Sequence, residues 1–133
     1  MSFGTPTVFI QIWVDTNAVQ HGSTNGLYLV DNRVGNGSTA EGSPSLATNV
    51  TAQSVIQWNV FNIDPTSLDV PQLTAIGNAP IWGASGQPQS DGAGGFVGQA
   101  QQAGGSGYDI TLNVQQSGGS GITIHVDPSM SVH

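Results

Sequence analysis

The apolar residues of this sequence alternate with polar ones in short runs, and this period of two most restricts the possible folds. A period of two places successive side chains on opposite faces of a β-strand. The clearest runs are TVFIQIWVD (7–15), LYLV (27–30), NVTAQSVIQWNVFNI (49–63), YDITLNVQ (108–115) and ITIHVD (122–127). No longer segment combines a helical period with helix caps. The sequence therefore predicts an all-β protein with little or no helix.

The turns between these runs and the length of the chain predict one β-sandwich domain. The 133 residues fall in the usual size range of a single domain, so we expect one unit over residues 1–133. Gly, Asn, Ser and Pro predict a surface loop over residues 35–45, and a hairpin loop over residues 117–121. Residues 49–63 predict one central strand, whereas residues 64–107 follow no clear pattern. The expected architecture is an antiparallel β-sandwich, either jelly-roll or Ig-like.

The small number of charges excludes several classes of partner. Only 7% of the residues are charged, the net charge is −7, and Arg33 is the one basic residue apart from the histidines. Binding to nucleic acid or to an anionic membrane depends on Lys and Arg, so we expect neither partner. The sequence has no apolar run of transmembrane length and no basic, signal-like start, which predicts a cytoplasmic protein. The absence of cysteine excludes disulfides and thiolate zinc sites.

Oxygen-rich side chains crowd two expected loops. Asp31, Asn32 and Asn36 lie around the end of the second run, and Asp64 and Asp69 follow the third. Carboxylate and amide groups hydrogen-bond to sugar hydroxyls, and their oxygens also bind calcium. We therefore consider Asp31, Asn32 and Asn36 as ligand-binding residues, and Asp31, Asp64 and Asp69 as a calcium site. The alternative is that each side chain closes a turn by bonding to its own backbone.

The tryptophans are expected to divide between core and surface. Trp13 and Trp58 lie in predicted strands, so we expect both in the core together with Ile56. Trp82 lies in a segment without a clear strand pattern, which predicts an exposed ring. Because an exposed aromatic face can stack on the C–H face of a sugar, Trp82 joins the candidate ligand-binding residues.

Motifs for catalysis or for a resident metal are weak. GGSGYD (104–109) matches part of a glycine-rich calcium repeat, but such a site needs consecutive nine-residue copies. The next copy, GGSGIT (118–123), lacks the acid, so hairpin turns are the favoured interpretation of both. His21, His125 and His133 do not have zinc-binding spacing, and no GxSxG motif is present. We therefore expect no enzyme, and calcium is the one cofactor left open.

Four segments, taken in order, resemble the AidA/PixA family of bacterial inclusion-body proteins. They are VFIQIWVDT (8–16), GLYLVDNRV (26–34), QSVIQWNV (53–60) and ITIHVDPSMSV (122–132). The first ends in the V-D-T-like step of that family, the third keeps a tryptophan without the preceding arginine, and the last keeps Asp-Pro without the closing tryptophan. The resemblance implies a β-sandwich with no known catalytic constellation, in some members stored as intracellular inclusions.

Two functions therefore remain open. The first is a non-enzymatic structural or storage protein that forms homo-oligomers, since few charges keep copies apart and no lysine protects the strand edges. The second is a lectin-like module that binds glycans, with or without calcium, through the oxygen-rich loops and Trp82.

Overall fold

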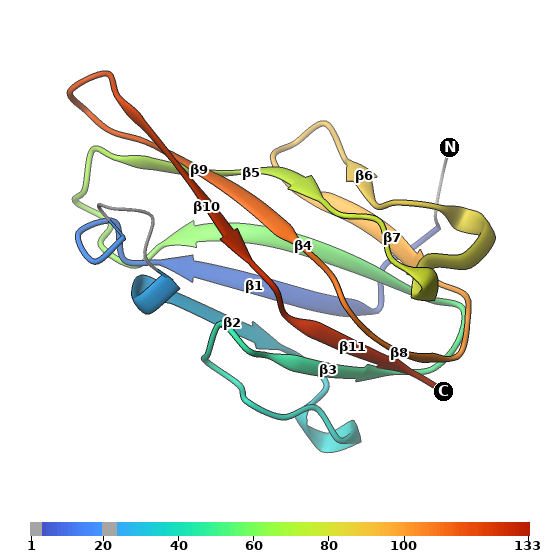
Figure 1. Ribbon diagram of the computed structural model, residues 1–133. Coiled ribbons are helices and arrows are strands. Elements are labelled where there is room, and N and C mark those ends of the chain that lie inside the picture. The colour runs from blue at the N-terminus through green and yellow to red at the C-terminus, as the bar shows by residue number, and fades with distance from the viewer. Residues whose placement is uncertain (1–3, 20–23) are drawn as a thin grey trace.

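Over residues 4–19 and 24–133, the computed structural model consists of eleven β-strands and three short 3₁₀ helices in two layers (Figure 1). His21 lies outside these described residues. The strands are β1 (Val8–Val14), β2 (Leu27–Asp31), β3 (Ala47–Val50), β4 (Ser54–Asn62), β5 (Val70–Ile76), β6 (Gln89–Ser90), β7 (Phe96–Ala100), β8 (Gly104–Gly107), β9 (Ile110–Gln115), β10 (Gly121–Val126) and β11 (Ser129–Val132). The helices are η1 (Thr24–Gly26), η2 (Val34–Asn36) and η3 (Pro80–Ser85). The all-β prediction is confirmed. No helix in the described ranges is long and apolar enough to cross a membrane.

The first layer is a five-stranded sheet in the order β2-β1-β4-β7-β6, with β4 in the middle as predicted. Its pairs are antiparallel except that β1 runs parallel to β4. A second parallel pair joins β3 and β11 in the other layer. Two of the three sheets are therefore mixed where we expected antiparallel pairing throughout, whereas the β10-β9-β5 sheet is antiparallel. Alternation fixes which face a side chain occupies, but it does not fix the direction of the neighbouring strand.

The second layer is built on one long hairpin that bends at its middle (orange to red in Figure 1). The half near its loop is β9 with β10, and the other half is β8 with β11. At the bend, the Tyr108 N–H donates to the Pro128 carbonyl at 3.0 Å. β5 pairs with β9 in one half, and β3 pairs with β11 in the other. The predicted C-terminal hairpin is thus confirmed, and it is shared by two three-stranded sheets.

The strand predicted over residues 49–63 is wrong in its extent. A turn at 51–53 divides it into β3, which lies in the second layer, and β4, which lies in the first. At this turn Gln53 takes a left-handed φ of 77°, and its N–H donates to the Ala100 carbonyl at 2.7 Å. Gly and Pro, the usual signals of a turn, are absent from these three residues, so sequence pattern alone did not reveal the break.

The core lies between the two layers and follows the predicted alternation. Val8, Ile10, Ile12 and Val14 of β1 are all buried, as are Ile56 and Trp58 of β4. On the hairpin, the buried hydrophobic residues are Tyr108, Ile110, Leu112, Val114, Ile124, Val126, Met130 and Val132. The prediction that Trp13 belongs to this core is wrong, because Trp13 is half-buried on the opposite face of the five-stranded sheet.

Candidate functional site

Asp31 and Asn32, two predicted ligand-binding residues, connect strands of the scaffold. The Asp31 carboxylate accepts hydrogen bonds from the Arg33 N–H at 2.8 Å and from the Thr48 hydroxyl at 2.7 Å. Asn32 Oδ1 accepts from the Phe9 N–H at 3.0 Å, while its Nδ2 donates to the Thr7 carbonyl at 3.1 Å. These bonds hold β2 against β1 and β3, so much of the polar capacity of both side chains is already used.

Asn36, at the end of η2, makes its hydrogen bond to β3 through its backbone. Its carbonyl accepts a hydrogen bond from Asn49 Nδ2 at 2.6 Å, which fixes the loop over β3. Beside Asn49 lies a groove of about 470 Å³ on the outer face of the β3-β11-β8 sheet. It is lined by glycines and other small residues together with polar residues that include Thr39, Asn49, Ser106, Ser129, Ser131 and His133, and it contains no acidic side chain and no aromatic ring apart from the histidine.

The acidic residues proposed for calcium do not gather. Asp64 Oδ1 accepts hydrogen bonds from the Thr66 hydroxyl at 2.7 Å and from the Thr66 N–H at 2.9 Å, which is the local turn considered as the alternative. Asp69 Oδ1 instead accepts from the Ser117 N–H at 3.0 Å, in the loop of the long hairpin. Within residues 4–19 and 24–133, no group of three or more acidic or histidine side chains could hold a metal ion. Asp31, Asp64 and Asp69 are therefore not brought together.

The GGSGYD motif (104–109) does not form the hairpin turn that the sequence analysis favours for it. Residues 104–107 form β8, which pairs with β11, and Tyr108 is buried immediately after it. Its second copy does contribute to a turn, since residues 117–120 close the long hairpin. The prediction of hairpin turns is therefore wrong for the first copy and confirmed for the second.

The prediction that Trp82 is exposed is wrong. Its side chain is 0% exposed and packs edge-to-face against Trp58 and Tyr108, with ring centroids 5.7 and 5.4 Å away. Trp82 Nε1 donates to the Gly77 carbonyl at 3.0 Å. Burial raises the pKa of Tyr108 well above its ordinary value, so this phenol stays protonated. The three rings belong to the core, because η3 turns Trp82 inward against the two layers.

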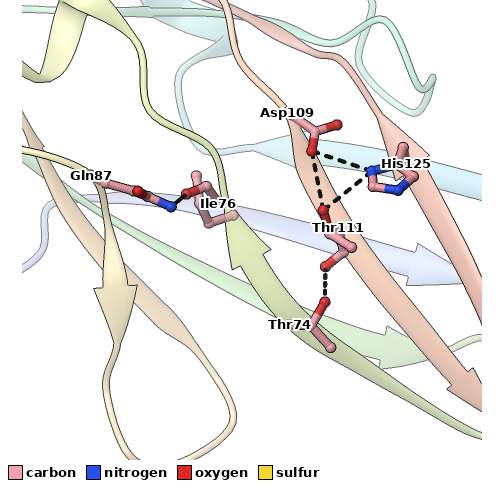
Figure 2. Close-up of polar contacts among 6 residues, drawn as sticks. All are labelled: Thr74, Ile76, Gln87, Asp109, Thr111 and His125. Atoms are coloured by element: carbon pink, nitrogen blue, oxygen red, sulfur yellow. Dashed lines mark hydrogen bonds and ion pairs between the residues drawn. The ribbon is translucent and has the colours of Figure 1, made fainter.

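A polar cluster that the sequence analysis did not single out lies on the exposed side of the long hairpin (Figure 2). His125 Nδ1 lies 3.3 Å from an Asp109 carboxylate oxygen and 3.3 Å from the Thr111 hydroxyl, and that hydroxyl donates to Asp109 at 3.1 Å. Thr111 and His125 are directly paired between β9 and β10, so the hairpin register could have revealed the contact. In a nucleophile–His–Asp triad, the hydroxyl and the carboxylate contact different ring nitrogens. Here both contact Nδ1, so the cluster lacks the geometry of a triad.

The most distinctive surface is the outer face of the five-stranded sheet, which we call the open face. Strand register places on it Phe9, Gln11, Trp13, Tyr28, Val30, Val55, Gln57, Asn59, Phe61, Gln89, Val97 and Gln99. None of these residues is charged. Phe9 and Tyr28 are 40% and 42% exposed, which is unusual for large aromatic side chains. The open face therefore combines aromatic rings with neutral amides.

An aromatic stack at one end of the open face borders a second groove. Trp13 and Phe61 are cross-strand neighbours whose rings stack with centroids 4.8 Å apart and planes 24° apart. The groove has a volume of about 460 Å³. It is lined by Asn59, Val60, Phe61, Pro71, Gln72, Leu73, Ala93 and Gly94. Sequence analysis missed this groove because it depends on where β7 ends relative to β4.

Comparison with known proteins places the chain in a family. The family described as "Domain of unknown function (DUF8788)" matches residues 6–120. The chain therefore belongs to the DUF8788 family. No curated protein matches the DUF8788 chain significantly.

A solved structure identifies the architecture of this DUF8788 protein. The DUF8788 chain is similar to the crystal structure of an inclusion body protein (PixA) from Burkholderia cenocepacia J2315, with a TM-score of 0.76. The similarity covers 98% of this chain and 97% of the other, at 12% sequence identity. The DUF8788 chain thus has a PixA-like fold, which confirms at the level of fold the resemblance found in the sequence.

Proposed function

We propose that this DUF8788 protein is a non-enzymatic, cytoplasmic β-sandwich protein of the inclusion-body type that self-associates through the open face. The observation that carries the proposal is the absence of any charged side chain from the twelve outward positions of the five-stranded sheet. The Asp91 carboxylate, in the loop after β6, reaches this face, where it accepts a hydrogen bond from Gln57 Nε2 at 3.2 Å.

Charge repulsion between copies favours contact through the open face over contact through other surfaces. Each copy carries a net charge of −7, so most approaches bring like charges together. Two open faces can meet with no charged side chain at the strand positions between them, and the contact would bury Phe9 and Tyr28. A second copy of the chain is thus the occupant that the face suits.

The size of the face indicates how strong that contact should be. Five strands about 4.8 Å apart, with strands roughly 20 Å long, give a face on the order of 400 Å². Stable interfaces bury about 800 Å² on each partner. We therefore expect weak pairwise association that becomes important at high protein concentration. The PixA-like neighbour, which is described as an inclusion body protein, supports this role.

Sedimentation velocity over a wide concentration range tests the proposal. The native protein should show a sedimentation coefficient that rises with concentration. Phe9→Lys, which places a charge on a central strand of the open face, should suppress that rise. Thr123→Lys on β10 adds the same charge to an exposed position of the other layer and should leave it unchanged. A native protein that stays monomeric up to millimolar concentration would overturn the proposal.

Carbohydrate binding is a second candidate function, and one specific observation favours it. The groove beside β4 is lined by the aromatic residue Phe61 together with two amide residues, Asn59 and Gln72. Pockets with this mixture of apolar and oriented polar groups suit small ligands with both apolar and hydroxyl-bearing faces.

A further inference from the structure

We infer that the groove beside β4 is a binding site for one or two rings of a neutral glycan, with a sugar ring stacked on Phe61. The inference rests on the second candidate function and assigns it a site. None of the residues considered for ligand binding from the sequence lines this groove.

The groove exists because β7 is shorter than the strand that it accompanies. β7 pairs with residues 54–58 of β4, the last pair being Trp58 with Phe96. Beyond Trp58, the loop over residues 91–95 replaces the strand, and Ala93 and Gly94 form one wall. Pro71 and Gln72 of β5 contribute to another wall. A volume of about 460 Å³ lies within the usual range for small-ligand sites.

The stacking surface is the face of Phe61 that Trp13 leaves uncovered. Because Trp13 and Phe61 are cross-strand neighbours, their stack extends across β1 and β4. The opposite face of Phe61 is therefore turned toward the side that β7 has left vacant, where Phe61 lines the groove. Trp13 fixes this ring, so little side-chain entropy is lost when a sugar binds to it.

The polar groups in the groove suit hydroxyls. Within residues 4–19 and 24–133, the side chains of Asn59 and Gln72 make no hydrogen bond to another residue, so their donors and acceptors are available. An amide both donates and accepts, as a sugar hydroxyl does. The groove lining contains no Lys, Arg or His, so the carboxylate or sulfate of an acidic sugar would find no cation there. This chemistry selects neutral sugars.

Asp91 is a positioning residue for the same groove. Its Oδ1 accepts hydrogen bonds from the Ala93 N–H at 2.7 Å and from the Gly95 N–H at 3.0 Å, and its Oδ2 accepts from Gln57 Nε2 at 3.2 Å. These bonds fix the wall formed by the loop. A Cβ at position 95 would lie 2.5 Å from Asn59 Oδ1, so glycine there allows the loop to pack against Asn59.

The test begins with an array of neutral and acidic glycans probed with the labelled full-length protein, with and without EDTA. Neutral glycans should bind, and EDTA should have no effect because no metal takes part. The methyl glycosides of the sugars that bind are then titrated into the native protein and three variants. Phe61→Leu and Gln72→Ala should each weaken binding, Phe61→Leu by about tenfold or more. Gln102→Ala changes an exposed glutamine outside the groove and outside the open face, and it should bind as the native protein does.

The outcomes distinguish a failure of the inferred site from a failure of carbohydrate binding as a function. If no neutral glycan binds, both the inferred site and carbohydrate binding are overturned. If glycans bind but Phe61→Leu and Gln72→Ala bind equally well, the site is wrong and the function stands. If Phe61→Leu does not fold, the side-chain amide NMR signals of Asn59 and Gln72 in the native protein decide the matter. They should shift on addition of the sugar, and unchanged signals would overturn the site.

Discussion

Trp58 and Tyr108 join the two layers of the sandwich by a hydrogen bond inside the core. Trp58 Nε1 donates to the Tyr108 hydroxyl at 3.2 Å, and the ring centroids lie 6.0 Å apart in an edge-to-face arrangement. Trp58 comes from the central strand of the first layer, and Tyr108 comes from the bend of the long hairpin. Each buried polar atom thus satisfies the other, which apolar packing alone would not achieve.

Truncating Trp58 should therefore destabilise the protein strongly. We expect Trp58→Ala to lower the free energy of unfolding by roughly 3–5 kcal/mol, because it leaves a cavity between the layers. Tyr108→Phe should cost about 1–3 kcal/mol, because it keeps the ring but leaves the indole N–H unpaired. Urea unfolding of both variants measures these values. A Trp58→Ala protein as stable as the native one would contradict the assigned core.

Gly26 should not tolerate a side chain. It is buried at the end of η1, and a Cβ there would lie 2.8 Å from the Ala18 Cβ and 2.9 Å from the Asp15 carbonyl oxygen. We expect Gly26→Ala to cost about 1–3 kcal/mol of stability through overpacking. Gly35→Ala is the matched control, because nothing lies within 4 Å of its Cβ position. Equal stability of the two variants in urea would show that the β1–β2 connection has room to move.

The register of the long hairpin should depend on β9 and far less on its loop. Deleting Thr111 would turn the buried Leu112 and Val114 toward the solvent face, which should abolish folding. Deleting Ser117 removes a loop residue whose N–H bonds to Asp69, so only a modest loss of stability is expected. Circular dichroism and denaturant unfolding distinguish the two variants. Similar tolerance of both deletions would contradict the register of β9 with β10.

The pKa of Asp64 should depend on the hydroxyl of Thr66. The hydrogen bonds from the Thr66 hydroxyl and N–H lower the pKa of Asp64 below its ordinary value. Because this pKa is lower in the folded protein, the ionised turn stabilises the fold above the unfolded pKa, and that contribution is lost as the pH falls through the folded pKa. Thr66→Val removes the hydroxyl, so the pKa of Asp64 should rise toward its ordinary value. Carboxyl ¹³C NMR titration measures the change, and an unchanged pKa would show that the backbone N–H alone is responsible.

Features that depend on local alternation could be predicted from the sequence. The apolar face of β1 and the paired arms of the long hairpin follow from the period of two, because each strand must bury one face. The turn at Gln53 could not be predicted, because its left-handed residue is not a glycine and its N–H bonds to Ala100 on a strand distant in the sequence. The parallel pairing of β1 with β4 is likewise decided by long-range packing.

The candidate sites also divide into features that the local sequence predicts and features that depend on long-range packing. Asp64 formed the local turn that its sequence neighbours allow, whereas Trp82 was placed in the core by rings at positions 58 and 108. The groove at Phe61 depends on the relative lengths of two strands that are far apart in the sequence. Residue types in a loop could therefore suggest a site, but the position of the groove required the assembled sheets.

The long hairpin that covers the core also sets the order in which the core can be closed during synthesis. All five strands of the first layer, and also β3 and β5, precede it in the chain, so they emerge from the ribosome before β8 to β11 do. Until then, the apolar face formed by Ile10, Ile12 and Trp58 has no complete cover. Incomplete β-structures of this kind expose surfaces that attract other chains. A nascent chain of this protein is therefore expected to associate readily with other chains until residues 104–132 have emerged and covered this face.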